Sequence, residues 1–217
     1  MSDYTLIIGN KNYSSWSLRP WLAMKVAGIE FDEKMILLFD DDWKANIASV
    51  SPNKCVPALQ HGDLTVWETL AILEYMADRH PDKNLWPVDP TARAVARSIS
   101  CEMHSGFSNL RGNMPMNIRR LTPGQGMGEG VAEDIARICA IWNDCRARFG
   151  VGGDFLFGDF TIADAMFAPV VNRLLNFDVK LDGISTAYRD AVLALPAMIE
   201  WSDAGRAETW AVFDDEV

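Results

Sequence analysis

Short apolar segments alternate with amphipathic ones along the first 80 residues. The apolar run 6–8 has the length of a strand, 31–38 predicts a second, and 58–60 and 64–66 flank a His-Gly-Asp turn as in a hairpin. Helical spacing of apolar residues predicts helices over 18–27 and 68–77, with a shorter one over 41–50. This order of elements predicts a mixed sheet with helices on its faces.

The pattern changes after a proline-rich, polar stretch at residues 81–90. Beyond it the strand signals stop and helical periodicity dominates. We therefore expect a first domain over 1–82, a linker over 83–90 and an all-helical domain over 91–217. The helices of the second domain are expected over the following residues: 91–113, 132–149, from 161 onward, 188–195 and 198–207.

Composition narrows the class of protein. The chain has 217 residues and a formal net charge of -10, which argues against nucleic acid or an anionic membrane surface as partner. No apolar run approaches the ~20 residues of a membrane span, and no basic leader precedes the first strand. The four cysteines lack metal-ligand spacing, so we expect reduced thiols, no metal and a cytoplasmic location.

Three serines lie where the first strand gives way to a helix, in the segment Tyr13-Ser14-Ser15-Trp16-Ser17. Serine before a helix is most often an N-cap, and we expect Ser17 to have that role. Hydroxyls at a helix N-terminus also suit an anion, because the free N–H groups and the helix dipole favour negative charge there.

Four motifs, in order and at the spacing of one family, make the chain resemble the glutathione S-transferases over nearly its whole length. The motifs are Ser14-Ser15-Trp16-Ser17, which resembles the serine-type signature of the zeta and theta classes, Asn53-Lys54-Cys55-Val56-Pro57-Ala58-Leu59, Trp67-Glu68-Thr69-Leu70-Ala71, and Phe160-Thr161-Ile162-Ala163-Asp164. The resemblance implies a thioredoxin-like first domain and a helical second domain that binds an electrophile.

The resemblance also implies that glutathione is the co-substrate. Glu68 suits the γ-glutamyl amine, and Thr69 suits the γ-glutamyl carboxylate at a helix N-terminus. A cis bond between Val56 and Pro57 would present backbone groups to the peptide-like middle of glutathione. Lys54 is expected to meet the glycyl carboxylate.

Activation of the glutathione thiol is assigned to a serine hydroxyl. Motif matching places the thiolate donor at Ser14, with Ser15 as a close second that assists or binds the γ-glutamyl carboxylate. Tyr13 competes less well, since it stands one residue early. Asp164 is expected to form a capping box with Thr161 and to serve folding.

A pocket for the electrophile is expected where the helical domain begins. Trp16, His104, Phe107 and Arg111 are its candidate residues, because aromatic side chains and a few polar anchors suit an apolar substrate. An anionic substrate would need local positive charge within this acidic chain. The resemblance also implies a homodimer.

Three alternatives remain beside a transferase. One is a glutathione-dependent cis–trans isomerase of the maleylacetoacetate type. Such members carry cysteine at the position of Trp16 and arginine at the position of Asn176. In this chain, the arginine of that helix is Arg173, one turn before Asn176. Thiol–disulfide chemistry needs a cysteine at the start of the first helix, which is absent. A non-catalytic glutathione-binding module is the third.

Overall fold

The computed structural model describes residues 2–211. Its N-terminal half holds one four-stranded mixed sheet in the order β2-β1-β3-β4. The strands are β1 (Tyr4–Gly9), β2 (Asp32–Ile36), β3 (Ala58–His61) and β4 (Leu64–Trp67). β1 runs parallel to β2 and antiparallel to β3, and β3 pairs with β4 across the hairpin. The predicted sheet and its thioredoxin-like order of elements are therefore confirmed.

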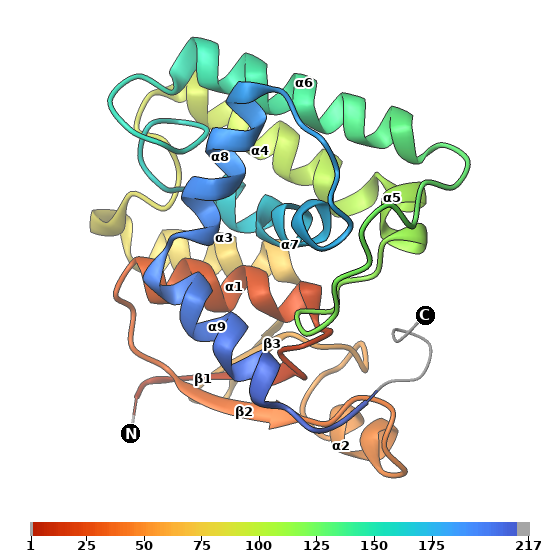
Figure 1. Cartoon of the computed structure of the whole chain (residues 1–217). Coiled ribbons are helices and arrows are strands. Elements are labelled where there is room, and N and C mark those ends of the chain that lie inside the picture. Colours follow the sequence, from red (N-terminus) through yellow and green to blue (C-terminus); the bar gives the residue numbers. More distant parts are fainter. Residues whose placement is uncertain (1, 212–217) are drawn as a thin grey trace.

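Alternate residues of β1 supply the two faces of the sheet, as the period of a strand requires. Leu6 and Ile8 pack into the large core beneath α1 (Ser15–Val26) and α3 (Thr69–Arg79). Ile7 faces the other way, into a smaller cluster with Ile47 of α2 (Trp43–Ala48). Figure 1 shows α1 and α3 above the sheet and α2 below it.

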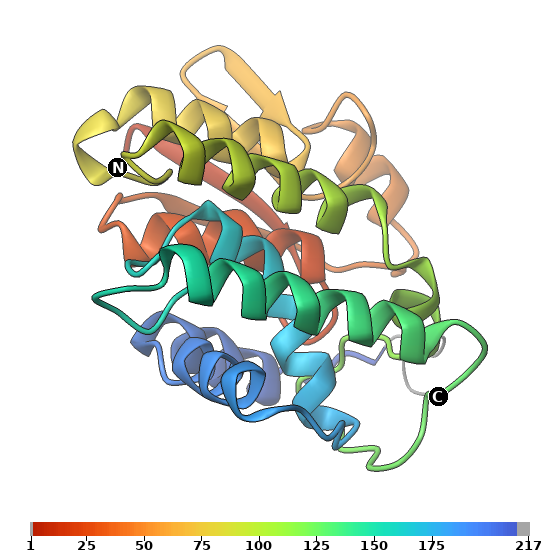
Figure 2. The ribbon, with the colours of Figure 1, turned by 90° about the horizontal axis from the view of Figure 1, so that it is seen from above.

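The second half is helical. A 3₁₀ turn (Pro81–Lys83) precedes the helices α4 (Pro90–Ser105), α5 (Ser108–Asn113), α6 (Val131–Phe149), α7 (Ile162–Asn176), α8 (Gly183–Leu193) and α9 (Pro196–Ala207). α7 is almost wholly buried. In Figures 1 and 2 it lies in the middle of the molecule, between α1 and α6. One hydrophobic core runs from the sheet through α1 and α7 into the helical half.

The start of α7 has the predicted capping box. Thr161 is the N-cap, and its backbone N–H donates a 2.8 Å bond to the carboxylate of Asp164. That carboxylate is fully buried and also accepts the N–H of Leu156 at 3.0 Å. Burial raises the pKa of Asp164 to about 6, although the bonds from Leu156 and Thr161 oppose the rise.

Two details of the sequence prediction were wrong. Ser17 is not the N-cap of α1, because the helix begins at Ser15 and Ser14 occupies the cap position. The predicted helix over 91–113 is two helices, since the chain turns at Phe107 with φ 56°, outside the helical range. Most other element ends shift by one to five residues.

The segment after α9 returns to the first domain. Glu208 accepts the backbone N–H groups of Lys11 and Asn12 at 2.6 and 3.1 Å. Trp210 donates from its indole to the carbonyl of Leu38 at 3.0 Å. The loop between β1 and α1 is therefore held partly by residues almost 200 positions away.

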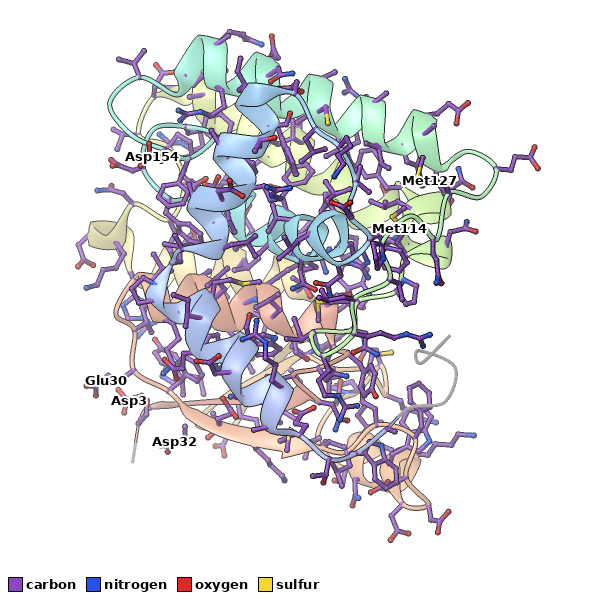
Figure 3. The ribbon with its side chains drawn as sticks, viewed as in Figure 1. Asp3, Glu30, Asp32, Met114, Met127 and Asp154 are labelled. Carbon is purple, nitrogen blue, oxygen red and sulfur yellow. The ribbon has the colours of Figure 1, made fainter. Side chains whose placement is uncertain are left out.

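Negative charge gathers at the end of the sheet where β1 begins. Asp3, Glu30 and Asp32 lie together at that end (Figure 3). Ser14 follows the opposite end of β1, about 20 Å away for a strand of this length. This acidic cluster is thus remote from the start of α1.

Candidate functional site

The serines of the first motif lie at the N-terminus of α1. Ser14 is the N-cap residue and Ser15 the first helical residue, and both are buried. The Ser14 hydroxyl donates a 2.8 Å bond to Ser17 Oγ, which also accepts the N–H of Gly9 at 3.1 Å. Ser17 thus fixes the turn that presents Ser14 and Ser15, from within the helix.

A cleft of about 240 Å³ opens beside this helix start. It lies between the sheet domain and the first helix of the helical domain. Its lining residues are Trp16, Asn53, Cys55, Val56, Pro57, Glu68, Thr69 and His104. The Val56–Pro57 bond is cis, as predicted. Three motifs far apart in the sequence therefore meet at one cleft.

Glu68 stands at the mouth of the cleft in an unusual backbone conformation. Its φ is 71° and its ψ 131°, a region that residues other than glycine rarely occupy. The side-chain amide of Asn53 donates a 2.8 Å bond to the Glu68 carboxylate. Asn53 also accepts from the Ser51 hydroxyl and the Cys55 N–H. One asparagine thereby couples the cis-proline segment to the acid.

Thr69 begins α3 and connects it to α1. Its hydroxyl donates a 3.1 Å bond to the carbonyl of Trp16. As the first residue of α3, it has a backbone N–H with no acceptor within the helix. The N–H group is the part of Thr69 best suited to bind an anion.

Trp16 forms the wall between this cleft and the helical domain. The ring centroids of Trp16 and His104 are 5.1 Å apart. The guanidinium carbons of Arg19 and Arg111 lie 4.3 and 5.6 Å from the centroid of the same indole. Positive charge therefore surrounds the indole where the two domains meet.

Arg19 is fully buried. It donates to the carbonyls of Ser15 and Met166, both at 2.9 Å. Burial, followed by the charges of Arg173 and Arg111, lowers the pKa of the Arg19 guanidinium well below its ordinary value. Arg173 also approaches the Ser15 hydroxyl, at 3.5 Å. Ser15 thus lies in an electropositive environment.

The structure brings most of the predicted site residues to the cleft, but not all of them. Val56, Pro57, Glu68, Thr69, Trp16 and His104 line the cleft together. Ser14 and Ser15 lie at the adjoining helix start. Arg111 is not a lining residue, and it donates a 3.3 Å bond to the backbone carbonyl of His104, which is one. Lys54 is exposed outside the lining, and Phe107 is buried in the hydrophobic core.

Three residues near the cleft were not predicted as part of the site. Asn53 and Cys55 line it, and Arg19 lies behind Trp16. Asn53 and Cys55 belong to the motif that contains Pro57, so their closeness to this proline in the sequence could have indicated that they line the cleft. Nothing local to Arg19 predicts its burial, because a helical arginine is ordinarily exposed.

Within residues 2–211, no group of histidine, cysteine, aspartate and glutamate side chains has the arrangement of a metal site. The described helices also include none with the length and apolarity to cross a bilayer.

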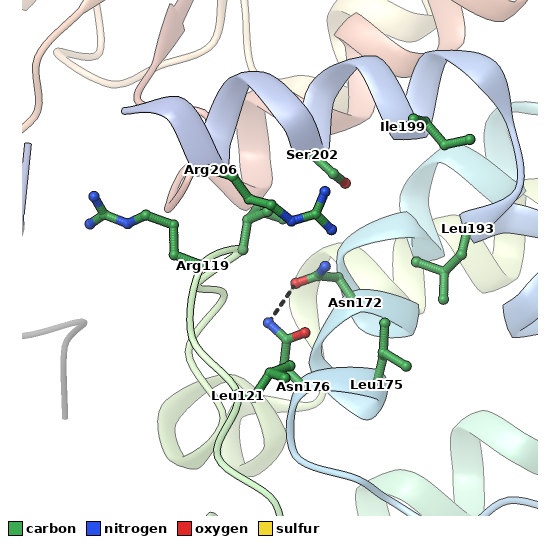
Figure 4. Close-up of a pocket in the computed structure, with 10 residues that line it drawn as sticks. Arg119, Leu121, Asn172, Leu175, Asn176, Leu193, Ile199, Ser202 and Arg206 are labelled. Carbon is green, nitrogen blue, oxygen red and sulfur yellow. Dashed lines mark hydrogen bonds between the residues drawn. The ribbon is translucent and has the colours of Figure 1, made fainter. Parts of the chain in front are cut away.

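A second hollow, of about 290 Å³, lies between α7, α9 and the segment before α6. Asn172 and Asn176 project into it from α7, and Leu193 and Ile199 from α8 and α9 (Figure 4). Asn176 donates to Asn172 across one wall at 3.4 Å. Its residues are not those of the motifs, so this hollow is separate from the cleft.

Comparison with known proteins identifies the family. Family models for the N-terminal and C-terminal domains of glutathione S-transferases match residues 13–79 and 125–204. A maleylacetoacetate isomerase of Rattus norvegicus is 30% identical over 84% of this chain and 84% of its own length. The chain belongs to the glutathione S-transferase family.

Other members agree with this assignment. A probable maleylacetoacetate isomerase of Caenorhabditis elegans is 28% identical over 85% of this chain and 86% of its own length. A glutathione transferase homologue from Burkholderia, solved with bound glutathione, has the same fold. The two structures align with a TM-score of 0.73 and 24% sequence identity. The alignment covers 94% of this chain and 99% of the Burkholderia chain.

Proposed function

We propose that this glutathione S-transferase family member binds glutathione in the cleft and activates its thiol for attack on a small electrophile. The observation that carries the proposal is the meeting of the cis Val56–Pro57 segment, Glu68 and Thr69 beside the N-terminus of α1. Each supplies a chemistry that one part of glutathione needs.

The γ-glutamyl end needs an acceptor for its amine and donors for its carboxylate. Glu68, held by Asn53, is the acceptor, and the free N–H at the start of α3 is a donor. The backbone of Val56 pairs with the peptide-like middle, in the manner of an added strand. Glutathione held in this way would present its cysteinyl thiol to Ser14 and Ser15.

Activation requires only a modest preference for the thiolate. Lowering a thiol pKa of ~8.5 by about two units needs ~2.7 kcal/mol. A hydrogen bond to a charged group supplies ~1.5–3 kcal/mol, and a helix N-terminus adds ~0.3–1 kcal/mol. One serine hydroxyl at the start of α1 therefore meets this requirement without a metal or a general base. For Ser14, the proton that it donates to Ser17 Oγ turns to the thiolate when glutathione binds.

Spectrophotometric titration of the thiol of bound glutathione tests the proposal. We expect a depressed pKa with the wild type and a value near that of free glutathione with Ser14→Ala. Ser15→Ala is expected to weaken glutathione binding, or to raise the thiol pKa by less than Ser14→Ala does. Ser98→Ala, at an exposed position of α4, is the matched control. Binding with no shift in the wild type would contradict the catalytic role and support a binding module.

Glutathione-dependent cis–trans isomerisation is the second candidate, because two of the relatives carry the name maleylacetoacetate isomerase. Trp16 and Asn176 differ from the isomerase pattern, so conjugation is the first choice. Isomerisation of maleylacetoacetate at a rate above that of free glutathione would reverse this order. The proposal includes a homodimer, which sedimentation equilibrium tests.

A further inference from the structure

The hollow between α7, α9 and the segment before α6 has three buried polar side chains in its lining. Asn172, Asn176 and Ser202 are 4%, 5% and 7% exposed. The asparagines come from α7 and the serine from α9, so they face the hollow from different walls (Figure 4). Buried polar atoms normally have hydrogen-bond partners. The atoms of these three side chains that lack a protein partner therefore indicate what the hollow can bind.

The side-chain amide of Asn176 is held in one orientation. Its nitrogen donates to the backbone carbonyl of Asn117 and, at 3.4 Å, to Oδ1 of Asn172. Turning the amide over would set its oxygen against two other oxygens, so the contacts fix the assignment. Both N–H groups of Asn176 are thus used within the protein, and its Oδ1 is left as an acceptor.

Asn172 is left with the complementary group. Its Oδ1 accepts from Asn176, so the amide nitrogen carries the two N–H donors that remain. Within residues 2–211, no hydrogen bond involves these N–H groups, Oδ1 of Asn176 or the Ser202 hydroxyl, and each retains surface that a small molecule can reach. A donor and an acceptor one helical turn apart therefore open on the hollow.

The other walls are apolar. The lining includes the aliphatic side chains of Ile118, Leu121, Leu175, Leu193 and Ile199. Leu121, Leu175 and Ile199 are exposed despite their size. A ligand with an apolar body would cover these side chains and remove their surface from water, which is favourable.

The charged residues of the lining are two arginines, and both have partners elsewhere. Arg119 donates to the Tyr13 hydroxyl at 2.7 Å, and Arg206 pairs with Asp203 at 2.8 Å. Among the described residues that line the hollow, none is acidic. The unmatched hydrogen-bonding groups are therefore neutral, and they match an uncharged ligand better than an ion.

We propose that this hollow binds a small uncharged molecule that carries a primary amide or a lactam. The ligand carbonyl accepts from the amide nitrogen of Asn172, and the ligand N–H donates to Oδ1 of Asn176. The apolar body of the ligand lies against the aliphatic walls, and the Ser202 hydroxyl bonds a further polar atom. The volume of about 290 Å³ is at the small end of ligand pockets, which suits a single ring.

This binding site goes beyond the proposed function and does not depend on it. The hollow and the cleft that holds Glu68 and Thr69 share no lining residue. Saturating glutathione should therefore leave the affinity of the hollow for its ligand unchanged. Competition between the two would place the ligand in the cleft and would overturn the proposal.

Benzamide is the probe, titrated into the full chain and followed by the methyl resonances of Leu175, Leu193 and Ile199. We expect saturable shifts at these methyl groups. N,N-dimethylbenzamide, which lacks the N–H donors, should bind about fivefold more weakly or worse, because a hydrogen bond to Asn176 is lost. Benzoate, which is charged and has no donor, should also bind more weakly than benzamide.

Two variants connect the binding to the named atoms. Asn172→Leu keeps the volume of the side chain but removes its donors, and should weaken benzamide binding about fivefold or more. Ser202→Ala is the milder change and should cause a smaller loss. Ser98→Ala, at an exposed position of α4, is the control and should bind benzamide as the wild type does.

Three results would overturn the proposal. They are the absence of saturable shifts at the three methyl groups, equal or tighter binding of N,N-dimethylbenzamide or benzoate, and unchanged benzamide binding by folded Asn172→Leu. If Asn172→Leu fails to fold, the comparison of the three probes on the wild type still decides the matter.

Discussion

Asn53 donates a 2.8 Å hydrogen bond from its side-chain amide to the carboxylate of Glu68. The two residues come from different segments, one before the cis proline and one before α3. Glu68 holds a left-handed backbone conformation that glycine would adopt more readily. The bond from Asn53 helps to keep that conformation and aims the acid at the cleft.

Replacing Asn53 by alanine should therefore weaken glutathione binding. The Glu68 side chain is about half exposed, so we expect a loss near 1 kcal/mol, or about fivefold in Kd. Isothermal titration calorimetry measures the change. Asn46→Ala, on exposed α2, is the matched control. An unchanged Kd in Asn53→Ala would mean that Glu68 needs no support from this neighbour.

The capping box of α7 predicts a large effect on stability. Asp164→Asn removes one of the two oxygens that accept the N–H groups of Leu156 and Thr161. We expect about 2–3 kcal/mol less unfolding free energy, because a buried donor is left unpaired. Urea unfolding at pH 8 measures this. Asp203→Asn, on the surface of α9, should change little.

The same pair of proteins tests the pKa of Asp164. Its folded-state pKa of about 6 is above the ordinary value of 3.8. The folded protein therefore takes up a proton between pH 8 and pH 5 while the unfolded chain does not. The part of the stability that comes from this proton uptake is lost as pH rises through 6. We expect wild type to gain about 1 kcal/mol over Asp164→Asn on going from pH 8 to pH 5.

Arg146 should stabilise the loop that follows α6. Its Nη1 lies within hydrogen-bond distance of the carbonyls of Gly150, Gly153 and Phe155. We expect Arg146→Ala to cost about 2 kcal/mol and to speed amide exchange in residues 150–158. Arg148→Ala removes an arginine two residues away that has a surface ion pair and a contact with the ring of Phe149, and should cost less than 1 kcal/mol. Equal exchange in the two variants would contradict this role.

Glu208 should stabilise the turn that presents Ser14 and Ser15, although it lies almost 200 residues away in the sequence. Its carboxylate accepts two backbone N–H groups just before that turn. We expect Glu208→Gln to lower the unfolding free energy by about 1–2 kcal/mol and to weaken glutathione binding as well. The control is Glu133→Gln, in the first turn of α6. A stability loss with unchanged binding would limit Glu208 to a structural role.

Local patterns predicted the fold well because its sheet follows from short-range rules. Alternation placed Leu6 and Ile8 on one face and Ile7 on the other, and a Gly-containing turn joined the last two strands. Ser17 was misassigned because a cap is defined by where the helix starts, and the serine-rich segment offers several starts. Its true partners, Gly9 and Ser14, become visible only when the strand end and the turn are placed together.

The site likewise has residues that local motifs predicted and residues that only tertiary packing brings together. Val56, Pro57, Glu68 and Thr69 belong to motifs that can be matched residue by residue, and they line one cleft. Trp16, His104 and Arg111 were expected in one pocket, but the position of Arg19 against the same indole was not predicted. The contact of one indole with arginines from both domains is a property of tertiary packing.

The bonds from Glu208 also bear on biosynthesis. During synthesis, Lys11 and Asn12 leave the ribosome almost 200 residues before the carboxylate that accepts their N–H groups. The sheet and α1 can assemble early, but this loop acquires these two hydrogen bonds only after α9 has been made. Products truncated before Glu208 would therefore lack these bonds in the loop that precedes Ser14.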